Sequence, residues 1–455
     1  LLVATTSSYN VAIGRNTMVA TTTGASNTGI GYASLTANTT GATNTAVGQG
    51  SLGANTTASN NTAVGYNSLV ANTTGTNNVA LGSSAGAALT TGSSNILIGS
   101  NTGDALTTAN ENVAVGHFSM SNNVLGAKNV AIGASTLSAT NPASAADMYN
   151  VAVGFQAGNA VTTGIQNTFV GGLSGDATTT ANNNAAFGYG SLGANTTGAL
   201  NTAIGSGALF NNTTASNNTA VGTNALLANT TGLYNTAIGT LSLDANTTAS
   251  FNTALGTFSL TTNTTGHSNT ALGYSALELN TTGIRNLAVG MQSLEANTTG
   301  SYNVAVGNSA LFANTTASNN TAVGYASLNA NTTGHENSAL GRNSLAANTT
   351  GQHNTGTGDS VLASTTTGSY NTAFGSAALY NNTTASNNTA VGYSVLLTNT
   401  TGSENTGLGH NALYGTTTGT GNTGIGQGAL QTNTTGGTNT AVGQGSLALN
   451  TTGAN

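Results

Sequence analysis

Cysteine is absent from this 455-residue sequence, so neither a disulfide framework nor a thiolate metal site can stabilise it. Charged residues make up only 3% of the chain, with four Lys or Arg against ten Asp or Glu. The four basic residues are isolated, which removes the electrostatic footprint that nucleic-acid binding needs. Apolar runs long enough to span a membrane are missing, and no signal peptide is visible. Composition therefore points away from disulfide-stapled, nucleic-acid-binding and membrane-spanning proteins.

Proline occurs once, at Pro142, and no Pro-rich linker or shift in composition divides the chain. Length alone would suggest about three globular domains. Without a boundary signal, we instead expect one continuous domain over residues 1–455. Because the sequence begins in the middle of a repeat, we interpret it as a stretch of something longer.

What the sequence does contain is one phrase, repeated every 17 residues: asparagine, a small or β-branched residue, usually alanine, an aliphatic residue and glycine. The closing glycines run from Gly14 to Gly443 in 26 copies, with one wider gap of 21 between Gly133 and Gly154. A short apolar strand and a glycine-closed turn in every copy are typical of a solenoid. We therefore predict an all-β fold, a parallel β-solenoid of about 26 coils.

When Asn61 is numbered position one, the residues at each of the 17 positions can be compared across all copies, and each such column can be assigned to the interior or to the surface. An aliphatic residue or Phe stands at position four in every copy except at Thr357, and Leu is the usual residue at position nine. Almost all charged residues fall at positions six, ten and seventeen. Charges are rarely buried without partners. We therefore predict that positions four and nine form the core and that six, ten and seventeen face solvent.

Asparagine fills position one in all copies. Asn side chains stacked at one coil spacing can bond amide to amide, or cap the turn before each strand. Either role predicts a structural Asn ladder. Its representative members are Asn61, Asn78, Asn201, Asn218, Asn235 and Asn252.

A second polar phrase, Asn-Thr-Thr, recurs in the turn of most coils. It formally provides N-glycosylation acceptors, and a solvent-facing turn would display them in a row. The alternative is that these Asn and Thr side chains satisfy backbone groups of the turn. The possible acceptors are Asn38, Asn55, Asn72, Asn195, Asn212, Asn229, Asn246, Asn263, Asn280, Asn297, Asn314, Asn331, Asn348, Asn382, Asn399, Asn433 and Asn450.

Four copies carry Gly in place of Leu at position nine: Gly86, Gly103, Gly158 and Gly175. Three of them gain an aliphatic at position twelve, namely Leu89, Leu106 and Val161. We interpret this as core volume that is moved, while Thr178 leaves the fourth copy without a replacement. The longer spacing predicts a four-residue insertion loop at about 138–149.

The histidines are scattered along the repeat. His335 and Glu336 are the nearest candidate pair, but adjacent residues usually point apart. The Gly-x-Gly strings lack the following helix that a dinucleotide site requires. We therefore predict no catalytic, cofactor-binding or metal site, and no enzyme.

The phrases YNVAIG at 9–14, KNVAIG at 128–133 and YNVAVG at 149–154 resemble the head repeats of trimeric autotransporter adhesins. Similar repeats occur in phage tail-fibre proteins. The resemblance implies a left-handed parallel β-roll with three chains side by side, on a bacterial surface or a virion. The mostly small residues at position three are compatible with such close approach of chains.

We therefore expect a structural and adhesive extracellular fibre, self-associating as a homotrimer or filament, with host surface or matrix glycans as partners. The alternatives are a phage tail fibre and an ice-binding or other ligand-binding solenoid, the latter built on Thr columns at positions two, thirteen and fourteen. Exposed aromatic side chains can bind sugars or partner chains. The column-six tyrosines with this potential are Tyr32, Tyr66, Tyr189, Tyr274, Tyr325 and Tyr393.

Overall fold

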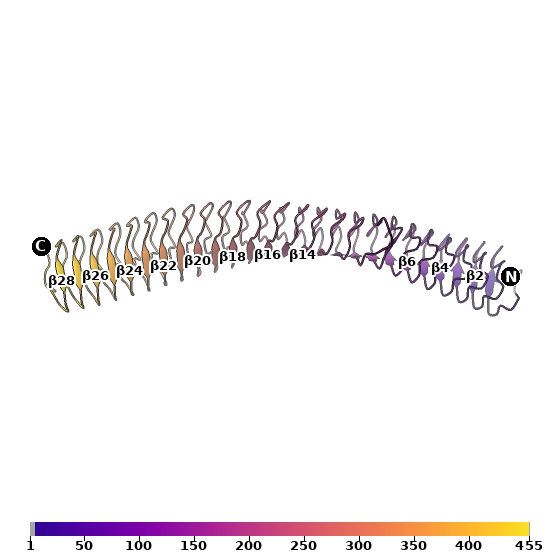
Figure 1. Ribbon diagram of the computed structural model, residues 1–455, viewed down its shortest axis with the longest axis horizontal. Helices are drawn as coiled ribbons and strands as arrows, with labels where there is room; N and C mark the ends of the chain where they lie inside the picture. The colour runs from indigo at the N-terminus through magenta and orange to yellow at the C-terminus, as the bar shows by residue number, and fades with distance from the viewer. Residues whose placement is uncertain (1–4, 455) are drawn as a thin grey trace. The chain divides into compact units, whose positions relative to one another are not determined.

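A computed structural model describes residues 5–454; residues 1–4 and 455, which the predicted domain includes, lie outside this range. The chain forms two compact units, Leu1–Thr231 and Gly232–Asn455. Each unit is a parallel β-solenoid with one coil per 17-residue repeat, as Figure 1 shows. The predicted fold class is confirmed.

Each coil contributes one strand of three residues, at positions two to four. In the first unit these are β1 (Val11–Ile13), β2 (Thr28–Ile30), β3 (Thr45–Val47), β4 (Thr62–Val64), β5 (Val79–Leu81), β6 (Ile96–Ile98), β7 (Val113–Val115), β9 (Val130–Ile132), β11 (Val151–Val153), β12 (Thr168–Val170), β13 (Ala185–Phe187), β14 (Thr202–Ile204) and β15 (Thr219–Val221). In the second they are β16 (Thr236–Ile238), β17 (Thr253–Leu255), β18 (Thr270–Leu272), β19 (Leu287–Val289), β20 (Val304–Val306), β21 (Thr321–Val323), β22 (Ser338–Leu340), β23 (Thr355–Thr357), β24 (Thr372–Phe374), β25 (Thr389–Val391), β26 (Thr406–Leu408), β27 (Thr423–Ile425) and β28 (Thr440–Val442).

Within each unit neighbouring strands pair in parallel, and their register equals the 17-residue period except across the insertion, where Val130 pairs with Val151. Thr253 pairs with Thr270, and Leu255 pairs with Leu272. Every column of the repeat therefore runs straight across the sheet, so a residue type repeated in sequence becomes a continuous row in space.

The interior is lined by positions one, three, eight, nine and twelve, which are Asn, Ala, Ser, Leu and Asn in a typical coil. The prediction for position nine is confirmed, because Leu69, Leu209 and most of their equivalents are fully buried, whereas Leu447 in the last coil is 50% exposed. The prediction that position four is interior is wrong: Ile204 is 41% exposed and Leu340 is 51% exposed. Side chains alternate along a strand, so the inward alanine at position three forces its neighbour at position four outward.

Buried asparagines form two ladders. In the first, Oδ1 of Asn303 accepts the backbone N–H of Asn320 at 3.0 Å. The Nδ2 of Asn303 donates to the Ala317 carbonyl at 2.8 Å and to Oδ1 of Asn286 at 3.2 Å. These side chains thus bond to each other and to the turn backbone, the two roles considered for position one. Buried polar groups that are fully bonded specify a packing register that a purely apolar core would not.

In the coils with Gly at position nine, the space of the missing Leu side chain is also filled from position three, which the sequence interpretation did not consider. In the second coil of each consecutive pair, position three is a large residue in place of Ala, Leu97 in one pair and Phe169 in the other, and both are fully buried. A Cβ on Gly86 would lie 2.7 Å from Leu97, and one on Gly158 would lie 2.9 Å from Phe169. Each large side chain occupies the space of the missing Leu side chains beside it.

The insertion predicted at about 138–149 is tied back to the solenoid. Its strand β10 (Ala146–Asp147) pairs in parallel with β8 (Gly126–Ala127), and Met148 is fully buried. The Lys128 ammonium lies 2.7 Å from the Asp147 carboxylate. The inserted residues therefore close a small additional strand pair instead of forming a free bulge.

Candidate interaction face

The outer face of the strands carries an apolar row in each unit. Position four points away from the core, and the register places it beside itself from one coil to the next. The most exposed members are Ile13, Ile30, Ile132, Phe187 and Ile204 in the first unit, and Ile238, Leu255, Leu272, Leu340, Phe374, Leu408 and Val442 in the second. Contiguous exposed apolar rows of this kind mark interaction surfaces more often than isolated residues do.

Aromatic residues flank this row at both ends of the strands. The predicted column-six tyrosines, Tyr32, Tyr66, Tyr189, Tyr274, Tyr325 and Tyr393, are all exposed. At position seventeen, Tyr234 and Phe251 stack on consecutive coils with ring centres 5.3 Å apart. The face therefore combines an uncharged aliphatic row with aromatic area, and most of the chain's few charged residues lie in the two flanking columns, at positions six and seventeen.

The threonine columns do not form a single hydroxyl lattice. At position thirteen the hydroxyl donates to the backbone carbonyl one coil further on, as from Thr281 to Thr298 at 3.0 Å. The next threonine, at position fourteen, is exposed in the turn, while position two lies on the strands. The hydroxyls at position thirteen thus already donate hydrogen bonds within the chain and are not free to bind a ligand in this way.

The asparagines of the Asn-Thr-Thr phrases lie inside the coil, with only Asn450 partly exposed. They form the second ladder: Nδ2 of Asn297 donates to Oδ1 of Asn280 at 2.8 Å and to the Gly300 carbonyl at 3.0 Å. Of the two alternatives for these asparagines, the structure shows the one in which their side chains satisfy backbone groups of the turn, and it contradicts their exposure to solvent in the folded chain. Glycosylation stays a prediction, and attachment would have to precede closure of the coil.

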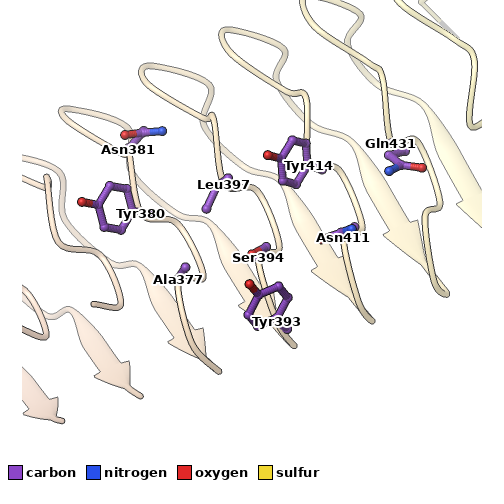
Figure 2. A pocket seen from close by; sticks show the side chains of 9 residues that line it. All are labelled: Ala377, Tyr380, Asn381, Tyr393, Ser394, Leu397, Asn411, Tyr414 and Gln431. Atoms are coloured by element: carbon purple, nitrogen blue, oxygen red, sulfur yellow. The ribbon is translucent and has the colours of Figure 1, made fainter. Parts of the chain in front are cut away.

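A groove of about 570 Å³ opens on the second unit, outside the strand row. Position ten of consecutive coils supplies Tyr380, Leu397, Tyr414 and Gln431, which follow one another along the groove in Figure 2. Asn411 stands beside them from position seven. The groove offers aromatic rings next to amide groups, the combination that suits a ligand with apolar ring faces and hydroxyl edges.

Position ten is less exposed than its charged residues predict. Burial raises the pKa of Asp104, Asp176 and Asp244, and it raises the pKa of Glu295 with a further contribution from the neighbouring Glu278 carboxylate. These carboxylates are only partly exposed, and the loss of hydration disfavours their charged form. Position ten faces solvent as predicted, but its carboxylates are only partly exposed.

Acidification is expected to stabilise the chain between neutral pH and about pH 4. A raised carboxyl pKa means that the folded state binds the proton more tightly than the unfolded state, so the free energy of unfolding rises as pH falls. The pKa values of Asp147 and Asp359 are lowered by hydrogen bonds from Lys128 and Arg342. Their contribution has the opposite sign, and it is lost only below the ordinary carboxyl range.

Urea unfolding of the wild type and of Asp244→Asn at several pH values tests this sign. The variant should be more stable than wild type at neutral pH and should gain less on acidification. Asp359→Asn is the matched control, because its carboxylate is exposed and paired with Arg342, Nε to Oδ1 2.8 Å. A urea midpoint that falls steadily from pH 7 to pH 4.5 in the wild type would contradict the expectation.

One cluster of ligand-type side chains was missed at the level of sequence. His335, Glu336 and His353 bring three potential metal-binding atoms within 4.8 Å of one another. Glu336 and His353 both occupy position seventeen and are therefore neighbours across one coil spacing. The signal in the sequence is the separation of 17 residues between Glu336 and His353, whereas the adjacent pair His335 and Glu336 does not reveal the cluster.

Comparison with known proteins leaves the chain without an assigned family. No protein-family model matches it, and no curated protein matches it. Within residues 5–454 no helix has the length and apolar character needed to cross a membrane. The exposed face and the groove are therefore the features of the chain that indicate a function.

Proposed function

We propose that this chain is a structural and adhesive extracellular fibre protein whose copies associate through the outer face of the strands. The observation that carries the proposal is the exposed apolar row at position four. A single solvated chain gains nothing from keeping aliphatic residues there, because burial of apolar area is what stabilises contacts in water. Association would bury this row.

A second and a third copy of the same chain are the occupants that fit the face best. The row repeats at the coil spacing, so a partner that covers all of it needs the same spacing, which another copy has by construction. The face carries few charges, and like-charge repulsion between copies is correspondingly small. The resemblance to trimeric adhesin heads favours three copies.

The same resemblance supports a location on a cell surface, with a virion tail fibre as the alternative. Both settings use a non-catalytic, repetitive chain to extend and attach. The proposal requires no cofactor.

Introducing charge into the apolar row is expected to dissociate the assembly. The triple variant Leu255→Lys, Leu272→Lys, Leu340→Lys places three ammonium groups at position four, where association would have to desolvate them. Sedimentation equilibrium should give about three chains per particle for the wild type and one for the variant.

The matched control places lysine in the same three coils, on the exposed turn: Thr265→Lys, Thr282→Lys, Thr350→Lys. It has the same charge and should stay assembled. A wild type that sediments as a monomer at micromolar concentration, or equal dissociation of both variants, would refute the proposed interface.

For adhesion we propose the tyrosine-lined groove as a glycan site. Sugar rings stack on aromatic faces, and amide groups hydrogen-bond to their hydroxyls. Tyr380 and Tyr414 stand two coils apart with Leu397 between them, which suits a chain of sugar units better than a single one.

Binding to immobilised glycans should be lost in the double variant Tyr380→Ala, Tyr414→Ala while the sedimentation of the protein is unchanged. Tyr325→Ala removes an exposed tyrosine outside the groove and should bind as the wild type does. Retained binding in the double variant would exclude the groove as the glycan site and would leave the proposed assembly unaffected.

A further inference from the structure

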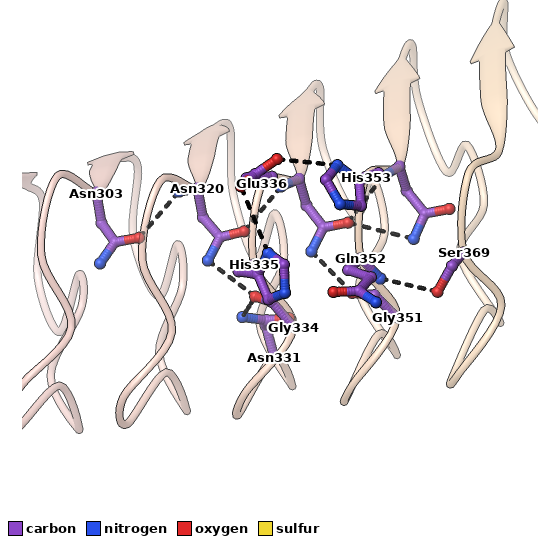
Figure 3. A network of polar contacts seen from close by, with 12 residues as sticks. Asn303, Asn320, Asn331, Gly334, His335, Glu336, Gly351, Gln352, His353 and Ser369 are labelled. Atoms are coloured by element: carbon purple, nitrogen blue, oxygen red, sulfur yellow. Dashed lines mark hydrogen bonds and ion pairs between the residues drawn. The ribbon is translucent and has the colours of Figure 1, made fainter.

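We propose that His335, Glu336 and His353 form a binding site for a divalent transition-metal ion, with Zn²⁺ as the reference ligand. The site lies in the second unit on consecutive coils and is separate from the glycan groove. Figure 3 shows the Glu336 carboxylate joined by dashed lines to both imidazole rings. This proposal does not depend on the adhesive function.

The fold determines which residues meet. The backbone at Glu336 has φ 59° and at His353 φ 56°, the conformation shared by position seventeen in other coils. The His353 N–H donates to the His335 carbonyl at 3.2 Å. The main chain that carries the two histidines is therefore held across one coil spacing before any ion binds.

The separations suit one small cation. Nδ1 of His353 lies 2.9 Å from Oε2 of Glu336, and Nδ1 of His335 lies 3.7 Å from Oε1. Ligands placed about 2.0–2.2 Å from a tetrahedral zinc ion are themselves about 3.4 Å apart. Small side-chain rotations are thus enough to bring all three groups onto one ion.

Ring contacts orient the imidazole that comes from the next coil. The His353 ring stacks on Tyr370 with centres 4.8 Å apart and planes 11° apart, and His335 meets its edge at 5.4 Å. All three residues are at least partly exposed, so solvent can reach the site and supply the remaining ligand.

The ligand set selects the class of metal. Two imidazole nitrogens with one carboxylate favour zinc and its transition-metal neighbours, whereas magnesium and calcium prefer oxygen ligands. No other group of three such side chains comes together within residues 5–454. We therefore expect one zinc ion per chain and no comparable site for magnesium.

Isothermal titration of the full chain with Zn²⁺ alone tests the assignment. The wild type should bind one ion per chain, and Glu336→Gln and His353→Asn should each weaken binding by about tenfold or more. These positions are on the surface, and a circular dichroism spectrum checks that each variant is folded. Mg²⁺ should give no saturable heat.

His410→Asn is the matched control. His410 also stacks on a tyrosine, Tyr393, with centres 5.4 Å apart and planes 11° apart, but it belongs to no group of three ligand-type side chains. This variant should bind zinc as the wild type does. Absence of saturable zinc binding below about 100 μM, or His353→Asn binding like the wild type, would overturn the proposal, since a good three-ligand site is expected to bind more tightly.

Discussion

Phe169→Ala is expected to lower the free energy of unfolding by about 3–5 kcal/mol. Phe169 is fully buried, and it fills the space beside Gly158 and Gly175, where other coils have leucine. Its removal would leave a void next to two glycines that have no side chains to move into it. Urea denaturation should report the loss, and amide hydrogen exchange should place it in coils near β12.

Phe187→Ala provides the matched control, because this phenylalanine is 40% exposed at position four of the next coil. Its removal should cost less than about 1.5 kcal/mol, since little buried area is lost. Equal destabilisation by the two variants would mean that the two glycine coils are not filled from position three.

Gly171→Ala is the second change with a large expected effect, about 3 kcal/mol or more. Gly171 closes β12 with φ 136°, a conformation that L side chains rarely adopt. A Cβ there would also overlap the backbone carbonyl of Gly188 on the next coil. Because coils stack directly, the neighbour cannot move aside without shifting the coil behind it.

Gly172→Ala, at the adjacent position, separates this effect from a general intolerance of substitution. Gly172 has no positive φ, and a Cβ would meet the Tyr189 ring at 3.6 Å and the Phe155 carbonyl oxygen at 4.0 Å, both ordinary contacts. Differential scanning calorimetry should show a clear loss of thermal stability for Gly171→Ala and almost none for Gly172→Ala. If both variants melt like the wild type, backbone closeness at position five does not limit the fold.

The fold could be predicted from sequence because the period is strict. One strand and one glycine turn per 17 residues leave few ways to bury leucine at position nine other than stacking. Position four was misassigned for a physical reason. Aliphatic character usually means burial, but a coil with Leu at position nine holds only a small residue at position three, which is the residue that points inward. Alternation along the strand then turns Ile204 and Leu340 outward.

Two other features become visible in the sequence only when residues at the same position of successive coils are compared. Leu97 and Phe169 are unusual only within position three, and their use becomes visible when they are set beside the glycines of neighbouring coils. The cluster of His335, Glu336 and His353 similarly depends on stacking at position seventeen. The Asn-Thr-Thr motif by itself allowed both exposed acceptors and side chains bonded to the turn backbone, and only the structure decides between them.

Mass per unit length of the native assembly, measured by scanning transmission electron microscopy, tests the central claim most directly. A coil of 17 residues weighs about 1.6 kDa and advances about 4.8 Å, so one chain gives roughly 0.35 kDa per Å and three chains roughly 1.0. We predict a value near 1.0, with the apolar row at position four buried between copies. A value near 0.35 would contradict association through this face and leave a single solenoid with an exposed apolar row.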